Sequence, residues 1–173
     1  MKKIWILPIV ILLLTACGST ETLETVSDVY VVPTMASMQQ VVVELPEELE
    51  MPALQDGQSG ELYICDGYTV TIQTMESGDL QKTIYTASGV SKENVQILQT
   101  EQEGNDRYEF VWTANTEEGM QVGRCCILDD GDYHYVITAM TEESEAGEVR
   151  DSWKRIFDTF HLESAEVDFN TGS

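Results

Sequence analysis

Alternating apolar and polar residues mark much of the middle of the chain as β-strands. In residues 107–114, aromatic side chains alternate with polar ones, which is the period of a strand with one buried face. Two hairpins are predicted, because in each case two β-branched or aromatic segments flank a short turn with an Asp-Gly step. The predicted strands are residues 40–45, 61–65, 68–74, 95–100, 107–114, 120–128 and 133–140.

Two segments instead repeat their apolar residues at helical spacing. Residues 79–88 have one apolar face, and Gly89 is placed to end that helix. A second segment carries a broader apolar stripe, and Ser144 or a neighbouring glutamate is expected to cap its start. The stripe comprises Val149, Trp153, Ile156, Phe157 and Phe160. Because strands and helices do not alternate regularly, the pattern predicts an α+β fold, a twisted antiparallel sheet with helices packed against it.

A different pattern occupies the N-terminus. Lys2 and Lys3 precede an apolar run over residues 4–14, which is shorter than the about 20 residues of a membrane-spanning helix. The tetrad at 14–17, Leu-Thr-Ala-Cys, resembles the lipobox of bacterial lipoproteins. This resemblance implies that a diacylglyceryl group is transferred to the sulfur of Cys17 and that the chain is cleaved directly before it. The lipid would then hold the protein on the extracytoplasmic face of the cell membrane.

These patterns divide the chain into four parts. Residues 1–16 are expected to be a lipoprotein signal peptide, and residues 17–37 the lipidated cysteine followed by a flexible tether. Residues 38–162 are expected to form a single α+β domain, which is long enough to bury a core without a metal or a disulfide. Residues 163–173 are expected to be an acidic C-terminal tail.

The order of the predicted elements resembles the PsbP-like fold over residues 40–162. The likeness lies mainly in the closing segment 153–160, Trp-Lys-Arg-Ile-Phe-Asp-Thr-Phe, and in residues 131–137 of the hairpin before it. Members of this family include photosystem accessory proteins, a Ran-binding import factor and bacterial lipoproteins. The resemblance implies a non-enzymatic binding or assembly module. It matches no functional motif, so it transfers no site residues.

The chain is strongly acidic, with 9 lysines and arginines against 31 aspartates and glutamates and a formal charge of −22. Removal of Lys2 and Lys3 with the signal peptide would leave 7 basic against 31 acidic residues, a charge of −24. Such a surface repels nucleic acid and anionic headgroups and attracts cations and basic proteins. We therefore expect no nucleic-acid partner. The expected partners are the membrane, through Cys17, and a basic envelope protein; an acidic cation-binding envelope protein is an alternative function.

Three cysteines, Cys65, Cys125 and Cys126, remain besides the lipidation site, and none of them forms a Cys-x-x-Cys motif. If the step at 130–131 is a two-residue turn, Cys126 lies opposite Tyr135 and points into the core. Cys65 is expected to share a face with apolar neighbours in the first hairpin. Cys65 and Cys126 are therefore predicted to be buried thiols, with a disulfide between them as the alternative.

Candidate catalytic and metal-binding groups are few. His134 and His161 lie 26 positions apart and belong to no recognisable hydrolase or metal motif. The aspartates at 129, 130 and 132 could collect Ca²⁺, although Asp and Gly are also favoured in turns for backbone reasons. The sequence therefore predicts no catalytic, cofactor-binding or metal-binding residue and no enzymatic activity. A thiol-dependent or hydrolytic envelope enzyme is the alternative.

Overall fold

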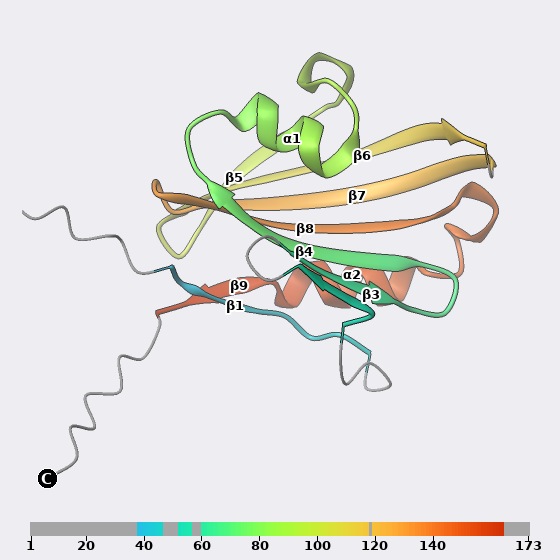
Figure 1. The fold of residues 1–173 in the computed structure, drawn as a ribbon, viewed down its shortest axis with the longest axis horizontal. Coiled ribbons are helices and arrows are strands. Elements are labelled where there is room, and N and C mark those ends of the chain that lie inside the picture. The colour runs from blue at the N-terminus through green and yellow to red at the C-terminus, as the bar shows by residue number, and fades with distance from the viewer. Residues whose placement is uncertain (1–37, 47–51, 57–59, 118, 165–173) are drawn as a thin grey trace, which may run out of the picture. The chain divides into compact units, whose positions relative to one another are not determined.

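An antiparallel sheet lies at the centre of the residues that the structure, a computed structural model, describes. These are residues 38–46, 52–56, 60–117 and 119–164, all within the unit Met35–Ser173. The strands of the sheet are β2 (Leu54–Asp56), β3 (Gly60–Ile64), β4 (Thr69–Glu76), β5 (Leu98–Gln102), β6 (Asn105–Thr116), β7 (Gly119–Asp129) and β8 (Tyr133–Glu142). Within the described residues they form one seven-stranded sheet in the order β2-β3-β4-β8-β7-β6-β5 (Figure 1).

The first predicted strand does not belong to this sheet. Only its first half forms a strand, β1 (Gln40–Val42). This strand pairs antiparallel with β9 (His161–Glu163), which the sequence pattern does not predict. Val43 and Leu45 follow β1 and pack, partly buried, against the core. The apolar character of residues 40–45 therefore reflects packing against the domain rather than pairing within the main sheet.

Two helices, α1 (Leu80–Ser88) and α2 (Arg150–Thr159), pack on opposite faces of the sheet. Figure 1 shows α1 in front of the strands and α2 behind them. Successive residues of a strand point to opposite faces. On β7, Cys126 accordingly belongs to the core under α2, whereas Cys125 belongs to the core under α1. The arrangement confirms the predicted α+β fold with a twisted antiparallel sheet.

The two helices begin in different ways. The carboxylate of Asp79 accepts a hydrogen bond from the N–H of Lys82 at 3.1 Å, and Gly89 ends α1 with a φ of 71°, as predicted. The prediction of a side-chain cap for α2 is wrong. Val149 precedes this helix without a capping side chain, and Ser144 lies in a separate 3-10 turn, η2 (Glu143–Glu145).

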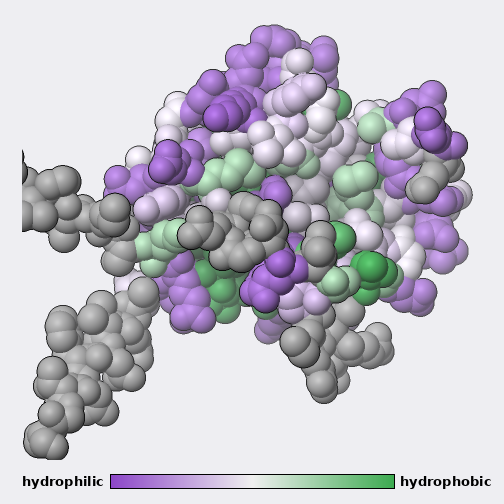
Figure 2. Space-filling view, viewed as in Figure 1, coloured by the Kyte–Doolittle hydropathy of each residue, from purple (hydrophilic) through white to green (hydrophobic). Residues whose placement is uncertain are grey.

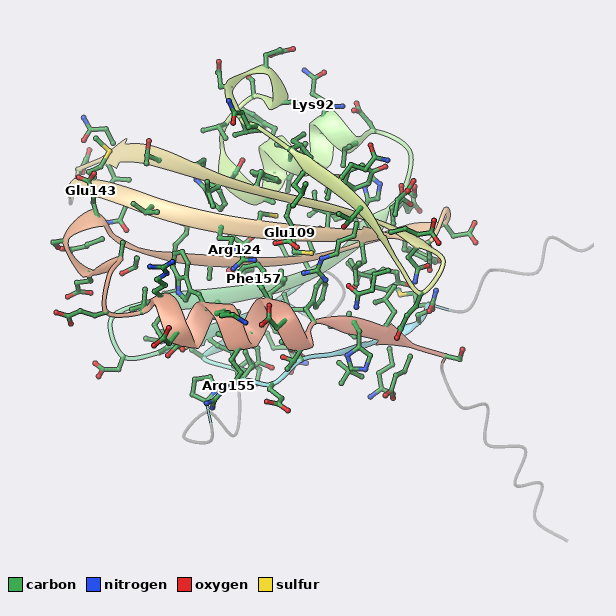
Figure 3. All side chains as sticks on the ribbon, turned by 180° about the vertical axis from the view of Figure 1, so that it is seen from behind. Lys92, Glu109, Arg124, Glu143, Arg155 and Phe157 are labelled. Atoms are coloured by element: carbon green, nitrogen blue, oxygen red, sulfur yellow. The ribbon has the colours of Figure 1, made fainter. Side chains whose placement is uncertain are left out.

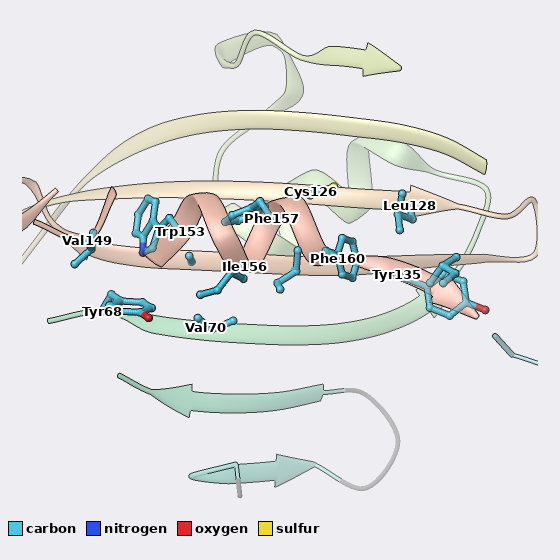
Figure 4. Close-up of a cluster of buried hydrophobic side chains, with 13 residues drawn as sticks. Tyr68, Val70, Cys126, Leu128, Tyr135, Val149, Trp153, Ile156, Phe157 and Phe160 are labelled. Atoms are coloured by element: carbon cyan, nitrogen blue, oxygen red, sulfur yellow. The ribbon is translucent and has the colours of Figure 1, made fainter. Parts of the chain in front are cut away.

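The apolar stripe of α2 faces the sheet as predicted (Figure 4). Its buried members are Val149, Trp153, Ile156, Phe157 and Phe160. They pack against residues of β4, β7 and β8, and this contact forms the larger part of the core on that face. Neither helix of the described residues is long and apolar enough to cross a membrane.

The β7–β8 hairpin has the predicted strands but not the predicted register. Asp130 donates its backbone N–H to the carbonyl of Tyr133 at 3.2 Å, so the two-residue turn is Gly131–Asp132 and begins one residue later than predicted. Cys126 therefore lies opposite Ile137 rather than opposite the tyrosine two positions earlier. A register change of two residues keeps each side chain on its predicted face. Cys126 is accordingly buried, as expected.

Candidate functional site

Two adjoining hollows lie at the end of the sheet where the β3–β4 turn, the end of β8 and the β6–β7 hairpin come together. The larger has a volume of about 590 Å³ and the smaller about 530 Å³, and both are lined by Ile64, Cys65, Gly67, Tyr68 and Glu145. We call the two together the acidic hollow. The carboxylates that line it are Asp66, Glu117, Glu142, Glu145 and Glu148.

The larger part of the hollow has an apolar floor, which follows from strand register. Thr69 on β4 pairs with Ile64 on one side and with Met140 on the other, so the three side chains share a face. Ile64 is 61% exposed. In Figure 2, green apolar and pale residues lie over the right half of this face, beside purple hydrophilic residues at its margin.

The short length of α1 leaves this floor partly exposed, with Met140 packed against the edge of the core under α1. A helix of nine residues is about 13 Å long, whereas a ten-residue strand such as β8 is about 33 Å long. The buried residue Thr83 of α1 contacts His134 near the start of β8. The helix therefore covers one end of the sheet, and the hollow lies at the other.

The β3–β4 turn is fixed against the end of β8. The hydroxyl of Thr141 donates a hydrogen bond to the carbonyl oxygen of Gly67 at 2.7 Å. Gly67 has a φ of 76°, and a Cβ at this position would lie 3.1 Å from Oε2 of Glu145. The positive φ therefore favours glycine here, and a side chain would also force the carboxylate of Glu145 to shift.

The thiols of the described residues are all free, so the alternative of a disulfide between Cys65 and Cys126 is not realised. Cys65 lines the hollow and is only partly buried, which differs from the prediction. Burial raises its pKa, although a hydrogen bond with Tyr68 acts in the opposite direction. Burial also raises the pKa of Cys126 to about 12 and the pKa of Cys125 above its ordinary value. These thiols stay protonated at neutral pH and are poor nucleophiles.

His134 belongs to a polar cluster that sequence reasoning missed. Its Nδ1 lies 2.7 Å from Oγ1 of Thr83 and its Nε2 lies 3.2 Å from Oδ2 of Asp129. The hydroxyl of Ser77 donates to the other oxygen of Asp129 at 3.0 Å. A neutral imidazole satisfies both contacts by accepting at Nδ1 and donating at Nε2. His134 is 1% exposed and does not line the hollow, so the cluster ties α1 to the sheet.

In the β7–β8 turn, aspartate side chains accept hydrogen bonds from backbone N–H groups of the same turn. Asp130 accepts hydrogen bonds from the N–H groups of Asp132 and Tyr133 at 3.0 and 2.7 Å. Burial raises the pKa of Asp130, but these N–H donors, together with hydrogen bonds from the side chains of Tyr135 and Gln39, outweigh burial and hold the pKa below its ordinary value. In the described residues, no group of three or more His, Cys, Asp or Glu side chains is placed to hold a metal ion.

On the α2 side of the sheet, one carboxylate lies between two arginines. Glu109 of β6 pairs with Nε of Arg107 at 2.8 Å and with a guanidinium nitrogen of Arg124 at 2.7 Å. Arg124 also lies over the ring of Phe157, 4.3 Å from its centroid, and Figure 3 shows it between Glu109 and this ring. Arg107 donates to the carbonyl oxygens of Phe157 and Phe160. The network fastens the C-terminal end of α2 to β6 and β7.

The predicted lipidation site, Cys17, lies outside the described residues, as do the predicted signal peptide and tether in residues 1–37. The other histidine, His161, is in β9, where its Nδ1 lies 2.7 Å from the carbonyl oxygen of Thr159. This contact raises its pKa. His161 does not line the hollow.

No family model and no curated relative matches the chain. Among solved structures, the chain is similar to LpqN of Mycobacterium tuberculosis, described as involved in cell envelope biogenesis. The TM-score is 0.50 and the identity 8%, over 73% of this chain and 85% of LpqN.

Two further structures are similar with lower scores. CyanoP, the cyanobacterial PsbP of Synechocystis sp. PCC 6803, gives a TM-score of 0.46 at 9% identity, over 74% of this chain and 95% of CyanoP. The Saccharomyces cerevisiae Ran-binding protein Mog1p gives 0.46 at 14% identity, over 72% of this chain and 95% of Mog1p. At such identities the likeness to LpqN shows the fold alone, and the α+β fold of this chain has a PsbP protein among its structural neighbours.

Proposed function

We propose that the protein is a lipid-anchored, non-catalytic binding module on the extracytoplasmic face of the cell membrane, and that the acidic hollow binds a basic segment of an envelope protein. The proposal is carried by one observation, a partly exposed apolar floor in a hollow that is also lined by carboxylates. Ile64 and Met140 offer a surface for the aliphatic part of a lysine or arginine side chain. Glu142 and Glu145 stand at the rim, where they can pair with its charged end.

The charge of the whole chain also favours a basic partner. A formal charge of −22 attracts a basic partner over a distance and raises its rate of association. At physiological ionic strength this attraction is screened beyond about 8 Å. Binding that depends on the hollow should therefore weaken as the salt concentration rises.

The chemistry of the hollow supports binding rather than catalysis. A hydrolytic or thiol-dependent enzyme would need a base within reach of the nucleophile. The residues described as lining the hollow include Cys65, whose pKa is raised by burial, and no histidine. The imidazole of His134 is already held between Thr83 and Asp129 under α1.

The location at the membrane is inferred from the lipobox-like tetrad at 14–17 and the apolar run before it. A tether over residues 17–37 would span roughly 25 Å as a flexible chain, enough to hold the domain clear of the headgroups. LpqN, whose fold the domain shares, is described as involved in cell envelope biogenesis. This is compatible with a place in the envelope for the present chain.

Binding of a peptide of alternating valine and lysine to the full-length protein in detergent tests the proposal. The double variant Glu142→Gln/Glu145→Gln should bind the peptide about three- to tenfold more weakly, the loss expected for two exposed ion pairs. Raising the salt from low to physiological concentration, about 0.15 M, should weaken binding to the wild type more than binding to the variant.

The matched control is Glu76→Gln/Glu93→Gln, which removes the same charge from exposed positions that do not line the hollow. It should bind nearly as well as the wild type. An equal loss in both double variants would show that only the net charge matters. Equally tight binding of a valine–glutamate peptide would contradict the proposal directly.

A further inference from the structure

Strand β6 is longer than the strand beside it at the margin of the sheet. β5 pairs only with Asn105–Glu109, whereas β7 pairs with β6 as far as Thr116. Among the described residues, 110–115 therefore have a strand on one side alone. In Figure 1 this part of β6 lies along the upper margin of the sheet, beyond β5. Strand residues at such a margin direct N–H and C=O groups away from the sheet, where another strand can pair with them.

This edge lacks the features that usually protect an exposed strand. Residues 110–115, Phe-Val-Trp-Thr-Ala-Asn, contain no charged residue and no proline. Their pairing with β7 runs residue by residue without a bulge. Natural proteins place charges, prolines or bulges at edges that must not pair. A run of β-branched and aromatic residues that lacks charges, prolines and bulges is suited to accept a further strand.

An apolar strip accompanies the edge on the α2 side of the sheet. Leu98 pairs with Glu109, and Val111 is two residues further along β6, so all three share this face. Leu98 and Val111 are each 63% exposed. Helix α2 packs over β4, β7 and β8 and leaves both side chains open to a partner.

We propose that an extended segment of the basic partner adds to the sheet along residues 110–115 of β6, its backbone pairing with β6 and its apolar side chains covering Val111 and Leu98. This inference rests on the proposed function. The edge leads directly into the acidic hollow, because Thr116 and Glu117 at the end of β6 line it. One basic segment can thus occupy the hollow and continue as a strand. A second copy of the chain is disfavoured as the occupant, because two molecules of charge −22 repel each other.

Hydrogen exchange of the full-length protein in detergent, with and without the valine–lysine peptide, tests the inference. The peptide should slow the exchange of outward-facing amides in residues 110–115 by about tenfold or more, as expected for newly formed hydrogen bonds. Val111→Glu should weaken peptide binding although it adds a negative charge, since it removes the apolar contact. Leu98→Glu provides a second variant on the same strip. Tyr85→Glu, at an exposed position on α1, is the control and should leave binding unchanged or slightly stronger.

The possible outcomes separate the two proposals. Salt-dependent binding without protection of residues 110–115, and with Val111→Glu equal to Tyr85→Glu, would overturn this inference and leave the proposed function standing. A peptide that does not bind at all would contradict both. Protection of residues 110–115 without peptide, lost on dilution, would place a second copy of the chain on the edge and would also overturn the inference.

Discussion

The indole of Trp112 occupies the space that a side chain at Gly123 would need. The two residues lie directly opposite each other on β6 and β7. A Cβ on Gly123 would lie 2.3 Å from Cζ2 of Trp112, far inside van der Waals contact. Trp112 is buried in the core under α1, where close packing leaves it little room to move. The missing side chain therefore allows a large aromatic residue to lie directly on the neighbouring strand.

Replacing this glycine should destabilise the domain. We expect Gly123→Ala to lower the free energy of unfolding by about 1–3 kcal/mol, because the indole must shift to admit the methyl group. Urea unfolding followed by tryptophan fluorescence measures the change. Gly147→Ala is the control, because Gly147 has open space around it and should tolerate the methyl group. Equal stability of the two variants would show that the packing of Trp112 does not require glycine at position 123.

At the scale of the elements, Glu109 and its two arginines join β6, β7 and the end of α2. Burial of Glu109 raises the pKa of its carboxyl, but hydrogen bonds and charge from Arg124 and Arg107 outweigh burial and lower it. A carboxyl whose pKa is lower in the folded than in the unfolded state stabilises the fold above its unfolded-state pKa. This stabilisation is lost as the pH falls through the folded-state pKa.

We therefore expect Glu109→Gln to unfold more easily than the wild type at neutral pH and to lose less stability on acidification. Urea unfolding at a series of pH values between neutral and the acidic range measures both effects. Glu101→Gln, an exposed position on β5, should leave the pH dependence nearly unchanged. Parallel pH profiles for Glu109→Gln and the wild type would show that the pairing with Arg107 and Arg124 contributes nothing to stability.

Elements that are marked by residues close together in the sequence, such as helix caps and apolar repeats, could be predicted from the sequence. Asp79 and Gly89 mark both ends of α1, and the stripe of α2 repeats at helical spacing. The pairing of β1 with β9 could not be predicted, because β9 has only three residues and its partner lies more than a hundred positions away. The sequence predicts the hairpin turn one residue before its observed position at Gly131–Asp132, since Asp-Gly and Gly-Asp steps both favour turns.

At the scale of the whole molecule, the sequence predicts the charge but not the hollow. The acidic composition is evident at once and points to a basic partner. The hollow depends on three segments far apart in the chain, the β3–β4 turn, the β6–β7 hairpin and the end of β8. It also depends on α1 being too short to cover the face of the sheet. Glu117 and Glu142 look like ordinary surface residues until the fold places them around one floor.

In the proposed function, the position of the molecule at the membrane depends on Cys17. A chain of charge −22 is repelled by anionic headgroups, so on this proposal the lipid supplies the membrane affinity that the domain itself lacks. One acyl chain binds a membrane only marginally, whereas two hold a protein firmly, and a diacylglyceryl cysteine supplies two. We therefore expect Cys17→Ser to abolish lipidation and either to release the protein or to stall it as a precursor.

Metabolic labelling with an alkyne fatty acid, followed by separation of membrane and soluble fractions, measures both effects. Cys65→Ser is the control, because it removes a cysteine that lies outside the tetrad at 14–17 and should label as strongly as the wild type. Labelling of Cys17→Ser at the wild-type level would show that the tetrad is not a lipobox. Loss of label with unchanged membrane association would show that the domain reaches the membrane through a protein partner. In that case the basic partner of the acidic hollow would itself be the anchor.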